Sequence, residues 1–275
     1  MARFTQGEAV GQSDVVAAVR YPPAMPTRLY SVVVDAADPA ALARFWSTAL
    51  GWPITFEEPD EVVVAPAEDE AGLPTGPGLP LVFVPVDDPK LVKNRVHLDL
   101  ASTSAAHQAE LVERVRRAGA RPLDIGQGAV PWMVLADPEG NEFCILEPRD
   151  EYRATGALAA VVLDTPDPVA LAPFWEAASG WSAEVLAGGD ARLTRPDGDG
   201  PYLELLRNDD ARVAKNRVHL DVAPAAAEDQ GAEVDRLLRR GATHADVGQG
   251  EKGERSWAVL ADPEGNEMCV LSPRD

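Results

Sequence analysis

The feature that most constrains this chain is an internal repeat, because four phrases of the sequence recur in the same order. KNRVHLDL at 93–100 returns as KNRVHLDV at 215–222, and VLADPEGNEFCILEPRD at 134–150 returns as VLADPEGNEMCVLSPRD at 259–275. DPAALARFWSTALGW at 38–52 and DIGQG at 124–128 recur, with substitutions, at 167–181 and 246–250. The chain is therefore a tandem repeat of a unit of about 120 residues, joined near residues 151–155.

Each repeat divides into two smaller modules that share one plan. In the first module an alternating β-branched run, LYSVVVDA, precedes Asp38 and Pro39, which predict the cap and the first residue of a helix. Gly51 predicts the end of that helix, and short strand-like runs follow it. The second module repeats this order with the strand RVHLDL and a helix over about 104–118. The sequence thus predicts a β-α-β-β-β order four times over, in an α+β fold.

The side chains of a strand alternate between its two faces, so the repeated phrase divides its residues into two sets. We expect Val96, Leu98 and Leu100 to face the covering helix. The opposite face carries Arg95, His97 and Asp99 in the first copy, and Arg217, His219 and Asp221 in the second. Three polar groups on one face indicate that this face lines a wet or ligand-holding space.

The four modules, with DPEGNEFC and the pattern DPxxLxxFWxxxLGW, resemble the vicinal-oxygen-chelate superfamily, the glyoxalase I, bleomycin-resistance and extradiol-dioxygenase group. Within it they are most similar to the actinobacterial glyoxalase-like branch. The resemblance covers 28–150 and 155–275, which we predict to be two tandem domains that follow an N-terminal arm, 1–27. It implies that paired βαβββ modules curl mixed sheets into two cups, one in each repeat.

The resemblance also implies where a metal would bind. Metal-using members place a ligand near the start of the first opening strand, a His on the second opening strand and a Glu on the last strand. This chain has Ser31, His97 and Cys144 at those positions in one repeat, and Ala160, His219 and Cys269 in the other. Because only the histidine is retained, we expect no cofactor in either cup. A divalent metal supported by neighbouring acids is kept as an alternative.

The candidate catalytic residues are the pairs His97–Asp99 and His219–Asp221, because a carboxylate that orients an imidazole is a recurring device for proton transfer. The alternative is that each pair is a structural polar ladder. Glu204, which aligns with Val82, is expected near the second cup and favours His219 as the working histidine. The candidate ligand-binding residues are Trp132, Trp257, Arg95, Arg217, Cys144, Cys269, Glu204, Asp35 and Asp164. The two arginines are expected either to clamp an anion or to form internal ion pairs.

Charge and cysteine content restrict the class of partner and the compartment. The formal net charge of −20 argues against a nucleic-acid or anionic-membrane partner. Two cysteines are too few for a secreted disulfide scaffold, and the N-terminal segment has no signal-peptide pattern, so a cytoplasmic location is expected. The expected partner is a small organic ligand, and the expected state is a monomer or homodimer.

Three functions remain open at this point. The first is a small-molecule binding protein that sequesters a metabolite or antibiotic in metal-free cups. The second is a metal-independent isomerase, lyase or cyclase that moves a proton with a His–Asp pair. The third is a divergent metal-dependent enzyme of the glyoxalase or dioxygenase kind. The fold does not choose between them, because function belongs to the site.

Overall fold

The computed structural model describes residues 27–68, 78–248 and 256–274. The first module contains β1 (Thr27–Ala36), α1 (Pro39–Leu50), β2 (Ile54–Glu58), β3 (Glu61–Val64) and β4 (Leu81–Pro85). The second contains β5 (Val96–Leu100), α2 (Ala105–Arg117), β6 (Arg121–Pro122), β7 (Met133–Ala136) and β8 (Glu142–Ile145). A short 3-10 helix, η1 (Asp150–Tyr152), lies between the repeats.

The second repeat follows the same plan. Its modules contain β9 (Leu158–Thr165), α3 (Pro168–Ser179), β10 (Ser182–Val185), β11 (Ala191–Thr194) and β12 (Tyr202–Arg207), then β13 (Val218–Pro224), α4 (Gln230–Arg239), β14 (Thr243–His244), β15 (Ala258–Ala261) and β16 (Glu267–Val270). The predicted βαβββ order is therefore confirmed in all four modules. None of the described helices is long and apolar enough to span a membrane.

The helix boundaries follow from the signals in the sequence. Asp38 accepts a hydrogen bond from the backbone N–H of Ala41 at 2.9 Å, and Pro39 is the first residue of α1. Gly51 ends α1 with a φ of 71°, a left-handed conformation that glycine adopts without strain. Asp167 caps α3 in the same way.

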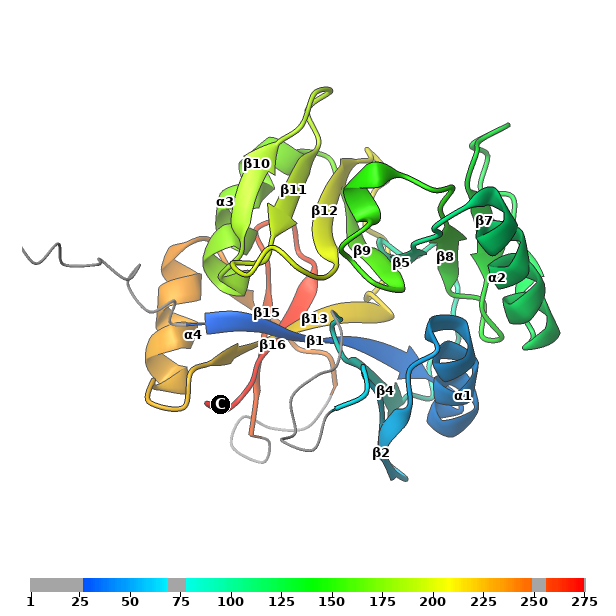
Figure 1. The fold of residues 1–275 in the computed structure, drawn as a ribbon. Coiled ribbons are helices and arrows are strands. Elements are labelled where there is room, and N and C mark those ends of the chain that lie inside the picture. Colours follow the sequence, from blue (N-terminus) through cyan, green and yellow to red (C-terminus); the bar gives the residue numbers. More distant parts are fainter. Residues whose placement is uncertain (1–26, 69–77, 249–255, 275) are drawn as a thin grey trace, which may run out of the picture.

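The modules pair in a nested order. One eight-stranded sheet has the order β10-β11-β12-β9-β5-β8-β7-β6 and combines the second and third modules; we call it the His97 sheet. The other has the order β14-β15-β16-β13-β1-β4-β3-β2 and combines the first and fourth; we call it the His219 sheet. The expectation that each repeat forms its own cup is wrong, because each sheet takes one module from each repeat (Figure 1).

Antiparallel pairs of opening strands form the centre of each sheet. In the His97 sheet β5 pairs with β9, and His97 lies opposite Val162. In the His219 sheet β1 pairs with β13, and His219 lies opposite Val33. Outside the sheets, α1 lies beside α2 and α3 lies beside α4 (Figure 1). The boundaries of the two predicted domains stay a prediction, since the repeats and the sheets divide the chain differently.

The core confirms the predicted faces of the strands and helices. Val96, Leu98 and Leu100 are buried in the main hydrophobic cluster. Phe45 and Trp46 of α1 and Phe174 and Trp175 of α3 are buried there as well. These aromatic side chains fill the space between helix and sheet, as the spacing in the sequence predicts.

The repeated DPEGNE phrase is a turn that ties modules together. Asp137 accepts hydrogen bonds from Asn141 and from the indole of Trp46, which lies in another module. Gly140 has a φ of 91°, in the left-handed region that side chains disfavour. Glu139 accepts the backbone N–H groups of Ala37 and Asp38 at 2.8 and 2.9 Å. The phrase is therefore structural, as expected.

Candidate functional site

The floor of the His97 sheet brings together three side chains from two neighbouring strands. Asp99 on β5 lies in register with Cys144 on β8, and His97 precedes Asp99 on the same face. The Nε2 atom of His97 lies 3.6 Å from Asp99 Oδ1, which is too long for a hydrogen bond. Within the described residues, Asp99 Oδ1 is buried and has no hydrogen-bond partner. We call the space above this floor the His97 cup.

One wall of the His97 cup alternates aromatic rings with guanidinium groups. Arg149 lies 5.6 Å from the ring centre of Trp132 and 5.9 Å from that of Tyr152. Arg192 lies 5.5 Å from the ring of Tyr152 and 4.4 Å from the ring of Tyr202. Cation–π contacts of this kind stabilise the row of side chains, of which Trp132, Arg149, Tyr152 and Arg192 line the cup and Tyr202 lies behind them.

Glu204 completes this wall, and its place corrects the sequence prediction. Its Oε1 atom accepts hydrogen bonds from Arg192 at 2.7 and 2.9 Å and from the Tyr152 hydroxyl at 2.9 Å. We expected Glu204 to accompany His219. It lies in the His97 cup instead, because β12 pairs with β9, whose other neighbour is β5.

A cavity of about 460 Å³ fills the His97 cup. Its lining includes His97, Asp99 and Cys144 at the floor, and Trp132, whose indole N–H donates to Gln127 at 3.0 Å. The apolar part of the lining comes from Ile125, Val134, Leu146, Leu186 and Leu206. The rest of the lining is largely polar and charged. A cavity of this size is large enough for a small molecule, and its lining offers both apolar surface and polar partners.

Burial controls the protonation of the floor. Burial raises the pKa of Asp99, and His97, Cys144 and Arg149 only partly oppose that effect. Burial, together with the neighbouring Asp99, also raises the pKa of the Cys144 thiol. Burial raises the pKa of Glu204 as well, although Arg192 and Tyr152 stabilise its charge. Such a floor favours a protonated carboxyl that can donate a hydrogen bond, and it disfavours a thiolate nucleophile.

The corresponding floor in the other sheet, which we call the His219 cup, is more deeply buried. The Nε2 atom of His219 lies 3.6 Å from Asp221 Oδ1 and 3.7 Å from the sulfur of Cys269. The His219 side chain is 7% exposed, whereas that of His97 is 15% exposed. Burial lowers the pKa of His219 to about 3 and raises the pKa of Asp221 to about 7.

The remaining members of the His219 cup also correct the expected sets. Ser31 lies opposite Asp221, and therefore accompanies His219 and Cys269 rather than His97 and Cys144. Ala160 likewise lies opposite Asp99. Trp257, which matches Trp132 in the repeat, is 36% exposed. The expected ligand sets are wrong because they assumed that each repeat closes on itself.

Each floor contains three types of metal-ligating side chain. The possible donor atoms of His97, Asp99 and Cys144 lie within 4.8 Å of one another, and so do those of His219, Asp221 and Cys269. Imidazole, carboxylate and thiolate are the usual ligands of zinc. Asp99 Oδ1 and Asp221 Oδ1 both have no partner among the described residues, and each supplies an acceptor that a cation would satisfy. The residues of both floors therefore fit a transition-metal ion, and the floor at His97 also opens into the cavity of about 460 Å³.

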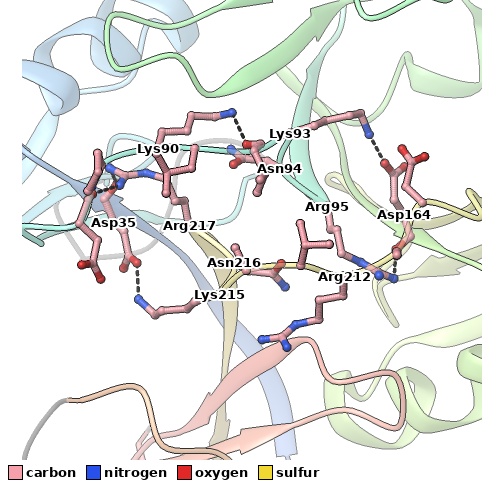
Figure 2. Close-up of a pocket in the computed structure, with 18 residues that line it drawn as sticks. Asp35, Lys90, Lys93, Asn94, Arg95, Asp164, Arg212, Lys215, Asn216 and Arg217 are labelled. Atoms are coloured by element: carbon pink, nitrogen blue, oxygen red, sulfur yellow. Dashed lines mark hydrogen bonds and ion pairs between the residues drawn. The ribbon is translucent and has the colours of Figure 1, made fainter.

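Four of the predicted site residues lie elsewhere, in a pocket between the two sheets. This central pocket, of about 540 Å³, is lined by the loops 88–95 and 210–217. Figure 2 shows Lys215 paired with Asp35 and Lys93 paired with Asp164. Arg95 and Arg217 donate to the backbone carbonyls of Asp164 and Asp35, at 2.9 and 2.8 Å.

These arginines also contact the DPEGNE turn of the opposite repeat. Arg95 lies 3.4 Å from Glu264, and Arg217 lies 3.2 Å from Glu139. The structure thus places both guanidinium groups in internal ion pairs, one of the two expected alternatives, and outside the cups. Asp164 and its partner Lys93 also border the His97 cup.

The sequence pattern did not indicate the residues that form the wall of the His97 cup. Arg149, Tyr152, Arg192 and Tyr202 were not among the candidates. One signal was available, because Arg192 and Glu204 lie in register on β11 and β12, where the other repeat has Val63 and Val82. A polar pair that replaces an apolar pair between two otherwise similar repeats marks a functional difference.

Comparison with known proteins places the chain in a family. A model of the glyoxalase-like domain matches residues 31–146 and 160–271. Glyoxalase I from Zea mays superimposes with a TM-score of 0.63 at 17% identity, covering 90% of this chain and 92% of that chain. A predicted dioxygenase from Bacillus subtilis gives 0.58 at 14% identity, covering 90% and 86%. No curated protein matches the sequence. At these identities the two structures establish the shared fold.

Proposed function

Because this chain belongs to the glyoxalase-like domain family, with two copies in tandem within the vicinal-oxygen-chelate superfamily, we propose that it is a small-molecule binding protein. The binding site is the His97 cup, and the ligand is sequestered there without turnover. The observation that carries the proposal is the cavity of about 460 Å³ between the aromatic wall and the buried polar floor.

The chemistry of the cup indicates what kind of ligand fits. Burial raises the pKa of Asp99 and so favours the protonated form of a carboxyl whose Oδ1 has no partner among the described residues. That group is suited to a hydrogen bond with an oxygen of the ligand. The indole of Trp132 and the ring of Tyr152 offer flat apolar surface nearby. We therefore expect a planar organic molecule with a carbonyl, amide or phenolic oxygen.

Two measurements test this proposal. Native mass spectrometry of the untagged protein, as purified, should show an added mass of a few hundred daltons that corresponds to an organic molecule. Isothermal titration calorimetry with the ligand thus identified should then show that Trp132→Ala weakens binding by roughly tenfold. The matched control is Trp257→Ala, at the equivalent position of the other repeat, which should change the affinity less than twofold. Equal losses in the two variants would contradict the assignment to the His97 cup.

A second candidate is a metal-dependent enzyme, and the convergence of His97, Asp99 and Cys144 favours it. A zinc ion, when bound, supplies a Lewis acid that polarises an oxygen of the substrate. In this chain the three side chains would hold the ion, and the aromatic wall would orient the substrate. This candidate differs from the first in requiring turnover.

Metal content separates the two candidates without an activity assay. Zinc, manganese and nickel are measured by inductively coupled plasma mass spectrometry after incubation with each ion and desalting. The enzyme candidate expects about one ion per chain, which His97→Ala removes and His219→Ala, its matched control, retains. A wild-type protein that retains no ion, or two variants that lose it equally, would rule out a metal site at His97.

A further inference from the structure

Arg114 and Arg236 occupy equivalent positions in α2 and α4, and they make the same hydrogen bond to the neighbouring helix. Arg114 donates from Nη2 to the carbonyl of Ala49 at 2.7 Å, and Arg236 donates from Nη2 to that of Ala177 at 2.8 Å. Each bond therefore joins a guanidinium group to a backbone carbonyl near the end of the neighbouring helix, α1 for Arg114 and α3 for Arg236. The two arginines are therefore a matched pair.

The residue one turn earlier differs between the two helices. Glu233 is buried and accepts from Arg236 Nε at 2.7 Å. Leu111 is equally buried but has no polar group to offer Arg114. Across the described part of the chain, Arg114 Nε is buried without a hydrogen-bond partner, and no carboxylate pairs with Arg114. A buried N–H group without an acceptor costs free energy, so α2 lacks the acceptor that α4 contains.

A cavity of about 690 Å³ lies beside Arg114 and Leu111. It is bordered by the end of α1, the end of β5, α2 and the segment 148–157 that joins the repeats. Apolar side chains form one part of the lining: Ala49, Leu50, Leu100, Ala101, Leu111 and Ala157. A cavity of this volume is large enough for a small organic molecule.

The charged groups around this cavity favour an anion. Arg114, Arg149 and Arg153 line it, and the only carboxylate among its lining residues is Asp150. Asp150 is paired with Arg153, and Glu147 is paired with Arg149, each at 2.7 Å. Arg114 is therefore the arginine of this lining that has no carboxylate partner among the described residues.

We propose that this cavity binds a small organic carboxylate with an apolar body. The carboxylate accepts from the guanidinium of Arg114, as Glu233 accepts from that of Arg236, and the apolar body lies on Leu50, Leu100 and Leu111. Guanidinium groups bind carboxylates through paired, charge-assisted hydrogen bonds, which gives the site its selectivity for an anionic head. The site is separate from the His97 cup, although Arg149 and Tyr152 line both cavities.

The test is isothermal titration calorimetry of the full chain with hexanoate, and with hexanamide as an uncharged probe of the same length. Hexanoate should bind in a 1:1 ratio, and hexanamide should bind at least about tenfold more weakly. Arg114→Gln should weaken hexanoate binding by at least about tenfold. Arg117→Gln, an exposed change on the same helix with the same loss of charge, should leave it within twofold. No binding of hexanoate to the wild type, or equal binding of the two probes, would overturn the proposal.

A second pair of variants keeps the proposal testable if Arg114→Gln unfolds. Leu111→Glu gives Arg114 an internal carboxylate and should abolish hexanoate binding, whereas Leu111→Gln makes a similar steric change without the charge. A loss at least about tenfold greater in Leu111→Glu than in Leu111→Gln supports recognition of a carboxylate by Arg114. Equal losses in the two variants overturn it. Far-UV circular dichroism confirms that both variants are folded before they are titrated.

Discussion

The His97 cup and the His219 cup have the same strand plan but different walls. Where β11 and β12 of the His97 sheet pair Arg192 with Glu204, the equivalent strands of the His219 sheet pair Val63 with Val82. The floors, in contrast, are nearly the same, with a histidine, an aspartate and a cysteine in each. The same fold therefore accommodates either a charged pair or an apolar pair in the wall of the cup, while the floor keeps the same three residue types.

The largest expected effect on stability comes from changing the polar wall of the His97 cup. Arg192→Val leaves the buried Glu204 without its cationic partner, and we expect a loss of about 3–5 kcal/mol in the free energy of unfolding. The double variant Arg192→Val with Glu204→Val copies the wall of the His219 cup. It should recover most of that loss, because a well-packed apolar pair is about as stable as a buried ion pair.

Urea unfolding of the wild type and the two variants measures this. A double variant that is as unstable as Arg192→Val would show that the His97 sheet itself depends on a polar wall. The two cups would then differ in architecture and not only in function. Recovery of stability with loss of ligand binding would show that Arg192 and Glu204 are retained for the ligand.

The buried pair of the His219 cup has its own signature in the pH dependence of stability. The folded pKa values are about 3 for His219 and about 7 for Asp221, and the ordinary values are 6.5 and 3.8. Between the two ordinary values, the folded pair carries its proton on Asp221 and the unfolded pair carries it on His219. Both states bind one proton, so the pair adds no slope to the stability in that range.

When either partner is replaced by a residue that does not titrate, the free energy of unfolding depends on pH through the remaining partner. In His219→Gln the folded state binds one more proton than the unfolded state, so stability falls as the pH rises from 3.8 towards 7. In Asp221→Asn the unfolded state binds the extra proton, so stability is lost as the pH falls from 6.5 towards 3. Each slope should approach about 1.4 kcal/mol per pH unit. Urea unfolding at three pH values in this range measures the slopes, and parallel profiles for the two variants would contradict the assignment.

The smallest expected effect concerns the one floor position at which the cups differ. Ser31 hydrogen-bonds to Asp221 in the His219 cup, whereas Ala160 gives Asp99 no such bond. Ser31→Ala should lower the free energy of unfolding by about 1 kcal/mol. Ala160→Ser should raise it by a similar amount or leave it unchanged. Thermal unfolding of both variants measures this, and a stabilised Ser31→Ala protein would show that the bond is absent.

Local features of the fold were predictable from the sequence, but the pairing of its modules was not. Asp38, Pro39 and Gly51 mark the ends of α1 because capping depends on neighbours in the chain. The choice of partner for β1 is different, since β5 and β13 carry the same KNRVHLD phrase and present the same edge. The repeated phrase itself therefore does not indicate whether β1 pairs with β5 or with β13.

The site was predictable to the same extent. His97, Asp99 and Cys144 meet because strands of one module are neighbours in any arrangement, and the alternation of faces places them together. Glu204 was assigned to the wrong cup because its position depends on the pairing of β9 with β5. Tyr152 belongs to no strand, and its contact with Glu204 arises only when the segment between the repeats folds against β12.

The nested order of the modules also determines which sheet can form first during synthesis. The second and third modules are adjacent in the chain, so the His97 sheet can close as soon as β12 has left the ribosome. The His219 sheet needs β13, and its central pairing places Ser31 opposite Asp221, which lies 190 positions later in the chain. Until then the first module has an unpaired strand edge, which is the part of the nascent chain most exposed to aggregation.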